Sequence, residues 1–213
     1  MTVYSMAIAF GSLACVAVLD LGPESLEAAE ELGWPVTVAL IVGGAIVLVV
    51  LDRLLPHHHH HHHGEEGSEE AAHIGVMAVL AVSVHNLAEG AAIVAIASQD
   101  LAAGFLLALG VGLHNAPMGM LLYSSLEQSR RRGIAVLAVA SLSTFVGGLV
   151  MFCMGNAVDE AVMLGVVCVA LGMIAYILFA ELLPAMVGTR DAKRTVIGIL
   201  IGAAFVVLGL SLG

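Results

Sequence analysis

The stretch Ser83–Gly119, SVHNLAEGAAIVAIASQDLAAGFLLALGVGLHNAPMG, consists of two apolar runs separated by the short polar segment Ser98–Asp100. Each run carries one copy of a related polar motif, VHNLAEG at Val84–Gly90 and LHNAPMG at Leu113–Gly119. Apolar runs of about 20 residues indicate helices that cross a bilayer. Because polar and ionisable residues cost free energy inside such helices, the two motifs predict a functional site within the membrane.

The composition of the whole chain supports this interpretation. Of the 213 residues, 60% are apolar and only 11% are charged, and apolar runs of membrane-spanning length recur along the chain. We therefore predict an all-α integral membrane protein, folded as a single transmembrane domain over residues 1–213 and in contact with the lipid bilayer. The seven predicted helices are Val3–Leu19, Pro35–Leu54, Ala72–Ala97, Leu101–Leu126, Gly133–Gly155, Val158–Val187 and Thr195–Leu212.

The positions of the basic residues predict the orientation of the chain. All seven follow the second, fourth or sixth predicted helix, whereas the other connections carry only acids. They are Arg53, Arg130, Arg131, Arg132, Arg190, Lys193 and Arg194. By the positive-inside rule the N-terminus is cytoplasmic and the C-terminus extracytoplasmic, with a plasma-membrane location expected. Residues 20–34 then form an extracytoplasmic acidic loop, and the net charge of -10 argues against a nucleic-acid partner.

Residues 56–71 contain a run of seven histidines and are predicted to form a disordered cytoplasmic loop, because they lack apolar residues. His-rich tracts bind metal ions flexibly and weakly. The predicted accessory metal-binding residues are His57, His58, His59, His60, His61, His62, His63 and His73.

The spacing of the polar residues within the two motifs predicts a metal site. His85 and Glu89 are four residues apart and share one helix face, and His114 and Met118 repeat this spacing on the next helix. The turn between the helices makes them antiparallel, so both sets reach similar depths, about 15 to 28 Å from the turn. The predicted ligands are His85, Asn86, Glu89, His114, Asn115 and Met118.

An alternative for any one of these residues is a purely structural role. A single His or Asn in a membrane helix commonly links neighbouring helices by hydrogen bonds, and Met is commonly a packing residue. An ionisable Glu89 beside His85, with a second His-Asn pair opposite, favours a metal site instead. Imidazole, carboxylate and thioether ligands suit Zn²⁺ or Cd²⁺ better than Mg²⁺ or Ca²⁺.

The motifs resemble those of the ZIP (Zrt/Irt-like protein) family of divalent metal transporters. VHNLAEG and LHNAPMG are similar to the HNxPEG and HxxPEG motifs of that family's fourth and fifth helices. GGAIVLVVLDRLLPHHHHH (Gly43–His61) resembles its third helix and His-rich loop, and AIAFGSLACVAVLDLGPESLE (Ala7–Glu27) resembles its second helix. LGMIAYILFAELLPAM resembles the seventh helix, with Glu181 and Pro184 in the ExxP pattern, which adds Glu181 to the candidate metal ligands.

The chain also departs from the family pattern. The resemblance implies eight helices in a 3+2+3 arrangement, so seven predicted helices correspond to a chain without the first. Ala88 stands where proline is usual, Met118 stands at the position of a glutamate, and Thr144 stands where the sixth helix usually supplies an acid. We therefore expect one metal ion rather than a carboxylate-bridged pair.

The sequence as a whole predicts a transporter that moves a zinc-type divalent cation toward the cytoplasm. The transported ion is Zn²⁺ or one of Fe²⁺, Mn²⁺, Co²⁺ and Cd²⁺, which the sequence does not rank, and the oligomeric state, including a homodimer, is left open. An alternative is a degenerate homologue that binds or senses metal without transport. An intramembrane enzyme is disfavoured, because neither HExxH nor a water-activating acid is identifiable.

Overall fold

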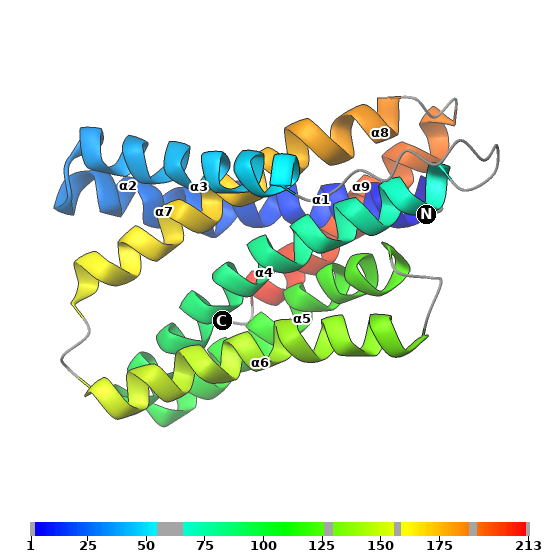
Figure 1. The fold of residues 1–213 in the computed structure, drawn as a ribbon. Helices are drawn as coiled ribbons and strands as arrows, with labels where there is room; N and C mark the ends of the chain where they lie inside the picture. Colours follow the sequence, from blue (N-terminus) through cyan, green and yellow to red (C-terminus); the bar gives the residue numbers. More distant parts are fainter. Residues whose placement is uncertain (1–2, 55–65, 126–129, 156–158, 188–190, 212–213) are drawn as a thin grey trace.

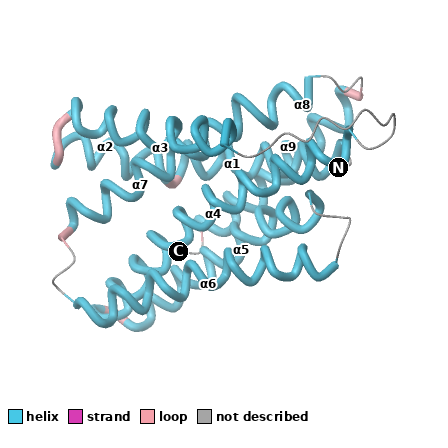
Figure 2. The backbone as a smooth tube through the Cα atoms, viewed as in Figure 1, coloured by secondary structure: helices cyan, strands magenta, loops and turns pink. Residues whose placement is uncertain are grey.

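The computed structural model describes residues 3–54, 66–125, 130–155, 159–187 and 191–211, and every regular element within these ranges is helical (Figures 1 and 2). The elements are α1 (Val3–Leu19), α2 (Leu21–Glu31), α3 (Trp34–Leu54), α4 (Glu66–Gln99), α5 (Leu101–Ser125), α6 (Arg130–Met154), α7 (Glu160–Tyr176), the π-helix η2 (Ile177–Leu182), α8 (Leu183–Val187) and α9 (Ala192–Leu210). The predicted all-α fold is confirmed.

Six helical segments are long and apolar enough to cross a membrane within the described ranges. They are Met6–Glu31, Trp34–Arg53, Met77–Ser98, Leu137–Met154, Glu160–Val187 and Ala192–Leu210. The remaining predicted span corresponds to α5, a helix of 25 residues that runs antiparallel to α4 after a turn at Asp100. The side chain of Asp100 accepts a hydrogen bond from the backbone N–H of Ala102 and so starts α5.

Charge is divided between the two ends of the bundle. α6 and α9 begin at the end toward which α3 runs, and these helix termini carry Arg53, Arg130 and Arg194 (Figure 1). At the opposite end lie α2 and the start of α7, with Glu24, Glu27 and Glu160 among their residues. The antiparallel helices thus gather the described basic residues at one end and an acidic group at the other.

Glycines bring α4 and α6 into backbone contact. A Cβ atom at Gly90 would collide with the carbonyl of Thr144, and one at Gly147 would collide with the carbonyl of Leu87. Small residues at such crossings allow membrane helices to gain van der Waals contact where the lipid supplies no hydrophobic driving force. This contact fixes α4, the helix that carries His85, against α6.

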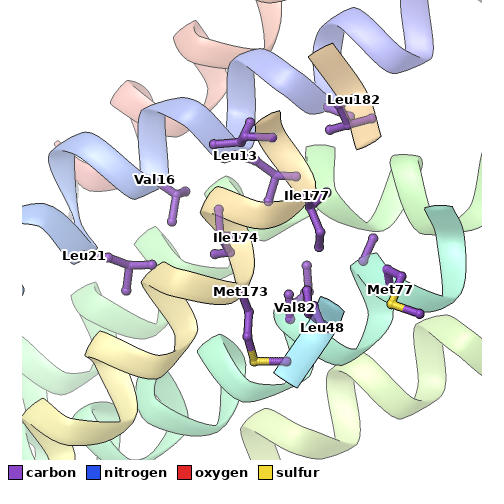
Figure 3. Close-up of a cluster of buried hydrophobic side chains, with 14 of the residues drawn as sticks. Leu13, Val16, Leu21, Leu48, Met77, Val82, Met173, Ile174, Ile177 and Leu182 are labelled. Carbon is purple, nitrogen blue, oxygen red and sulfur yellow. The ribbon is translucent and has the colours of Figure 1, made fainter. Parts of the chain in front are cut away.

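The buried core lies between α1, α3, α4 and the α7–η2 segment (Figure 3). Its largest fully buried apolar side chains are Leu13, Leu21, Leu48, Met77, Ile174, Ile177 and Leu182. Large apolar side chains also cover the outside of the bundle; Phe145 and Phe152 on α6, for example, are 65% and 78% exposed. An outer surface of this kind is stable against lipid rather than water.

The segment predicted as an acidic loop at residues 20–34 is largely the helix α2, so that prediction was wrong in its local structure. Leu21, Ser25 and Ala28 recur at helical spacing and are buried, which gives this acidic segment an inward-facing stripe. Pro23 lies in the first turn, where its missing N–H costs no intrahelical hydrogen bond. α2 ends before Gly33, which adopts a positive φ of 85°.

The predicted span 158–187 is interrupted by the π-helix η2. Pro184 follows it and lacks the N–H that would bond the carbonyl four residues earlier, while the N–H of Leu183 bonds the carbonyl of Leu178. This shift to hydrogen bonds five residues apart widens the helix locally. The sequence did not predict this π-helix.

The histidine run His57–His63 lies outside the described residues. α4 begins at Glu66, so the end of the predicted disordered loop 56–71 is helical, which corrects that part of the prediction. His73 lies on α4, but its side chain is not among those described.

Candidate metal centre

The centre of the candidate site is a pair of side chains one turn apart on α4. His85 Nε2 lies 3.1 Å from Glu89 Oε1, and the two side chains are 1% and 8% exposed. The spacing of four residues places them on the same face of the helix, as the sequence predicted. A buried imidazole and a buried carboxylate in contact form two ligands of the kind that bind Zn²⁺.

Asp20 adds a third candidate ligand from the junction of α1 and α2. Its Oδ2 lies 3.9 Å from His85 Nε2, and one ligand atom from each of Asp20, His85 and Glu89 lies within 4.8 Å of the other two. Asp20 occupies the N-cap position of α2 but forms no side-chain capping bond there. Its carboxylate is directed toward His85, and together the three side chains offer one nitrogen and two carboxylates to a cation.

Asp20 was not predicted as a site residue from the sequence. The aspartate ends an apolar run and was counted with the acidic loop, since its approach to α4 depends on the packing of α1 and α2. An acid next to the end of a predicted membrane helix was the available signal, although it does not identify a partner.

Asn115 of α5 contacts the same carboxylate from the other side. Its Nδ2 donates a hydrogen bond of 2.8 Å to Glu89 Oε2. Asn86 behaves differently, because its Nδ2 donates to the backbone carbonyl of Ala140 on α6 at 3.0 Å. Of the two predicted amide residues, Asn115 therefore contacts the candidate ligand Glu89, and Asn86 links α4 to α6.

The candidate ligands Asp20, His85 and Glu89 line a cavity of about 460 Å³ that reaches the acidic end of the bundle. Apolar residues of α4, α5, α7 and α9 form most of its wall. Its acidic lining residues are Asp20, Glu24, Glu27, Glu89 and Glu160. We call this space the acidic cavity.

A second space lies beside the acidic cavity, and Val111 of α5 lines both. This groove has a volume of about 780 Å³ and is lined by α4, α5 and α6. Its polar lining residues are Asn86, Asn115, Ser141 and Thr144, and they are all neutral. Asn86 Oδ1 and Asn115 Oδ1 are buried without a hydrogen-bond partner. We call this space the neutral groove.

The other predicted ligands stand as follows. His114 and Met118 lie on α5, but their side chains are not among those that the structure describes. Glu181 lies in η2 and interacts electrostatically with Tyr176, as does Asp52 at the end of α3. Glu181 is thus outside the group formed by Asp20, His85 and Glu89.

Comparison with known proteins gives one similarity to a curated protein. No family model matches the chain, and no solved structure matches it. The chain is 29% identical to the human (Homo sapiens) protein "Zinc transporter ZIP4" over 131 residues, which cover 59% of this chain and 20% of that protein. The chain therefore spans about a fifth of the length of this relative.

The similarity and the fold agree on the coarse character of the protein. It is a multi-pass, all-α membrane protein with a distant and partial similarity to a zinc transporter. It also contains an Asp-His-Glu group, with His85 buried and Asp20 partly buried, whose ligand atoms are close enough to hold a metal ion.

Proposed function

We propose that the protein transports Zn²⁺, or a divalent cation of similar chemistry, across the membrane through the site formed by Asp20, His85 and Glu89. The observation that carries the proposal is the convergence of these ligand atoms within 4.8 Å inside a membrane-spanning bundle. Buried ionisable residues in a membrane typically mark ion pathways. The similarity to a zinc transporter supports the same assignment.

The acidic cavity provides the route by which a cation reaches this site. Glu24 and Glu27 of α2 and Glu160 of α7 line it between the acidic end of the bundle and the ligands. Clustered carboxylates with low-dielectric walls raise the local concentration of cations. The ion then exchanges hydration water for the side chains of Asp20, His85 and Glu89.

We propose transport toward the end of the bundle that carries the basic residues. Positive charge marks the cytoplasmic side of membrane proteins, so the acidic cavity faces outward and the N-terminus is cytoplasmic. The neutral groove is linked to Glu89 by the hydrogen bond from Asn115, and it offers amide and hydroxyl oxygens to an ion that leaves the site. These weaker ligands favour release over retention.

Uptake of Zn²⁺ into proteoliposomes tests the proposal. The wild-type protein is expected to accumulate Zn²⁺ down an imposed gradient, and the combined His85→Ala and Glu89→Ala variant is expected to lose this uptake. Glu30→Gln and Glu31→Gln are matched controls, because both acids are exposed on α2 and neither lines the acidic cavity. Wild-type rates in the double variant would refute the assignment.

The alternative function is metal binding or sensing without transport. Thr144 favours it, since a neutral hydroxyl occupies the position at which the resembling family carries an acid, and Thr144 lines the neutral groove. This alternative predicts saturable Zn²⁺ binding by the reconstituted wild-type protein together with uptake no faster than in protein-free vesicles.

A further inference from the structure

The two carboxylate oxygens of Glu89 face different partners. Oε1 lies 3.1 Å from His85 Nε2, on the side of the acidic cavity. Oε2 accepts a hydrogen bond of 2.8 Å from Asn115 Nδ2, and Asn115 lines the neutral groove. One oxygen is therefore directed to the proposed cation, while the other is occupied by an amide donor.

The orientation of the Asn115 amide follows from this contact. An amide carries two N–H donors and one carbonyl acceptor, and only the donors attract a carboxylate oxygen. The opposite orientation would place two oxygens against each other. Asn115 Oδ1 consequently faces away from Glu89 and is buried without a hydrogen-bond partner, which is costly unless water or an ion satisfies it.

We propose that Asn115 is a positioning residue that limits Glu89 to one metal-binding oxygen. The hydrogen bond to Oε2 fixes the rotation of the carboxylate and directs Oε1 toward the space shared with His85 and Asp20. This inference rests on the proposed function, since it concerns the same cation, and it assigns Asn115 a role other than the direct metal ligand predicted from the sequence.

The expected consequence is selectivity for ions of low coordination number. A carboxylate that binds through one oxygen, together with an imidazole and a second carboxylate, leaves a fourth position for water, which is the arrangement preferred by Zn²⁺. Mn²⁺ prefers an oxygen-rich octahedral shell, which a carboxylate binding through both oxygens helps to fill. Asn115 therefore favours Zn²⁺ over Mn²⁺.

Comparison with Asn86 and Ser141 separates the positioning role of Asn115 from a role in helix packing. Asn86 is also a buried amide, but its donor bonds the carbonyl of Ala140 and so links two helices. Ser141 lines the same groove as Asn115 and is exposed. Ser141→Ala is the matched control, since it removes a polar group from the groove without removing the hydrogen bond to Glu89.

The test measures metal binding by the full chain in lipid nanodiscs. In every protein His57–His63 are replaced by serine, so that this run does not contribute to the signal. Zn²⁺ and Mn²⁺ affinities are measured by competition, and the visible absorption of bound Co²⁺ reports whether the site is tetrahedral. The proteins compared are the parent, Asn115→Leu, Asn115→Ala, Asn115→Gln and Ser141→Ala.

In Asn115→Leu we expect the Zn²⁺ Kd to rise about tenfold, within the 10- to 100-fold range typical of partners that hydrogen-bond a metal ligand. We also expect a smaller preference for Zn²⁺ over Mn²⁺ and a weaker Co²⁺ band, because Glu89 can then bind through both oxygens. Asn115→Gln restores a donor and should recover both properties, and Ser141→Ala should match the parent.

The outcomes separate this inference from the proposed function. Parent-like Zn²⁺/Mn²⁺ preference and Co²⁺ absorption in Asn115→Leu overturn the positioning role alone. If Asn115→Leu does not fold, the same criterion applies to Asn115→Ala, which removes the donor without adding bulk. A parent protein that binds neither Zn²⁺ nor Co²⁺ overturns the proposed function itself.

Discussion

The acidic cavity and the neutral groove differ in charge although both are lined with polar groups. Asp20, His85 and Glu89 line the acidic cavity, whereas Asn86 and Thr144 line the neutral groove. Carboxylates and imidazoles hold a divalent cation strongly, whereas amides and hydroxyls supply only dipoles. Under the proposed function, the acidic cavity captures the ion and the neutral groove releases it, and Glu89 is next to both through its own lining position and its hydrogen bond with Asn115.

The largest effect is expected from the two α4 ligands of the acidic cavity. Glu89→Gln keeps the shape of the side chain but removes its charge, and His85→Ala removes the only nitrogen of the described ligand group. Each change should weaken Zn²⁺ binding by at least about 100-fold, more than the loss of a residue that only supports a ligand. Isothermal titration of the reconstituted protein measures the effect, and an affinity within threefold of wild type would contradict it.

Asp20→Asn tests the ligand that the sequence did not identify. The substitution preserves the size of the side chain. It also breaks no capping hydrogen bond of α2, since the Asp20 side chain makes none there. We expect Zn²⁺ affinity to fall about 10- to 100-fold, less than for Glu89 because Asp20 lies farther from His85. Competition with a fluorescent zinc chelator measures the change, and Glu30→Gln serves as the charge-matched control.

Thr144→Glu would make the neutral groove resemble the acidic cavity. A carboxylate there lies among Asn86 and Asn115, whose buried amide oxygens have no hydrogen-bond partner. We expect a second Zn²⁺ ion to bind and transport to slow, because the ion is retained where release requires weak ligands. Zinc content per chain, measured by mass spectrometry of the metal, should rise from one to two in the background without His57–His63. An unchanged content would show that the groove does not admit the ion.

The smallest effect is expected from the acids in the outer part of the acidic cavity. Glu24→Gln and Glu27→Gln remove charges that attract the cation electrostatically. Zn²⁺ uptake at subsaturating concentration should fall about two- to fivefold at low ionic strength, and the difference should shrink in about 1 M salt, where the Debye length is about 3 Å. A loss that is independent of salt would instead assign these residues to the binding site.

Much of the fold could be predicted because a bilayer imposes simple rules on sequence. Long apolar runs gave the membrane helices, and the spacing of His85 and Glu89 gave their contact on one face of α4. α2 was missed because its charged residues obscured the helical recurrence of the buried Leu21, Ser25 and Ala28.

The remaining features depend on contacts between distant parts of the chain. The sequence contains no local signal that brings Asp20 to His85, or that assigns the amide of Asn115 to Glu89 and that of Asn86 to Ala140. Both amides were therefore predicted as equivalent ligands. Helix packing, partly set by the close approach at Gly90 and Gly147, decides between them.

The most direct test of the central claim is to locate the cation by anomalous X-ray scattering from crystals of the full chain grown with Zn²⁺. We expect an anomalous peak bordered by Asp20, His85 and Glu89, at the bonding distances of about 2.0 to 2.2 Å typical of zinc with nitrogen and oxygen ligands. A zinc-loaded, transport-competent protein whose anomalous peaks all lie away from these three side chains would contradict it.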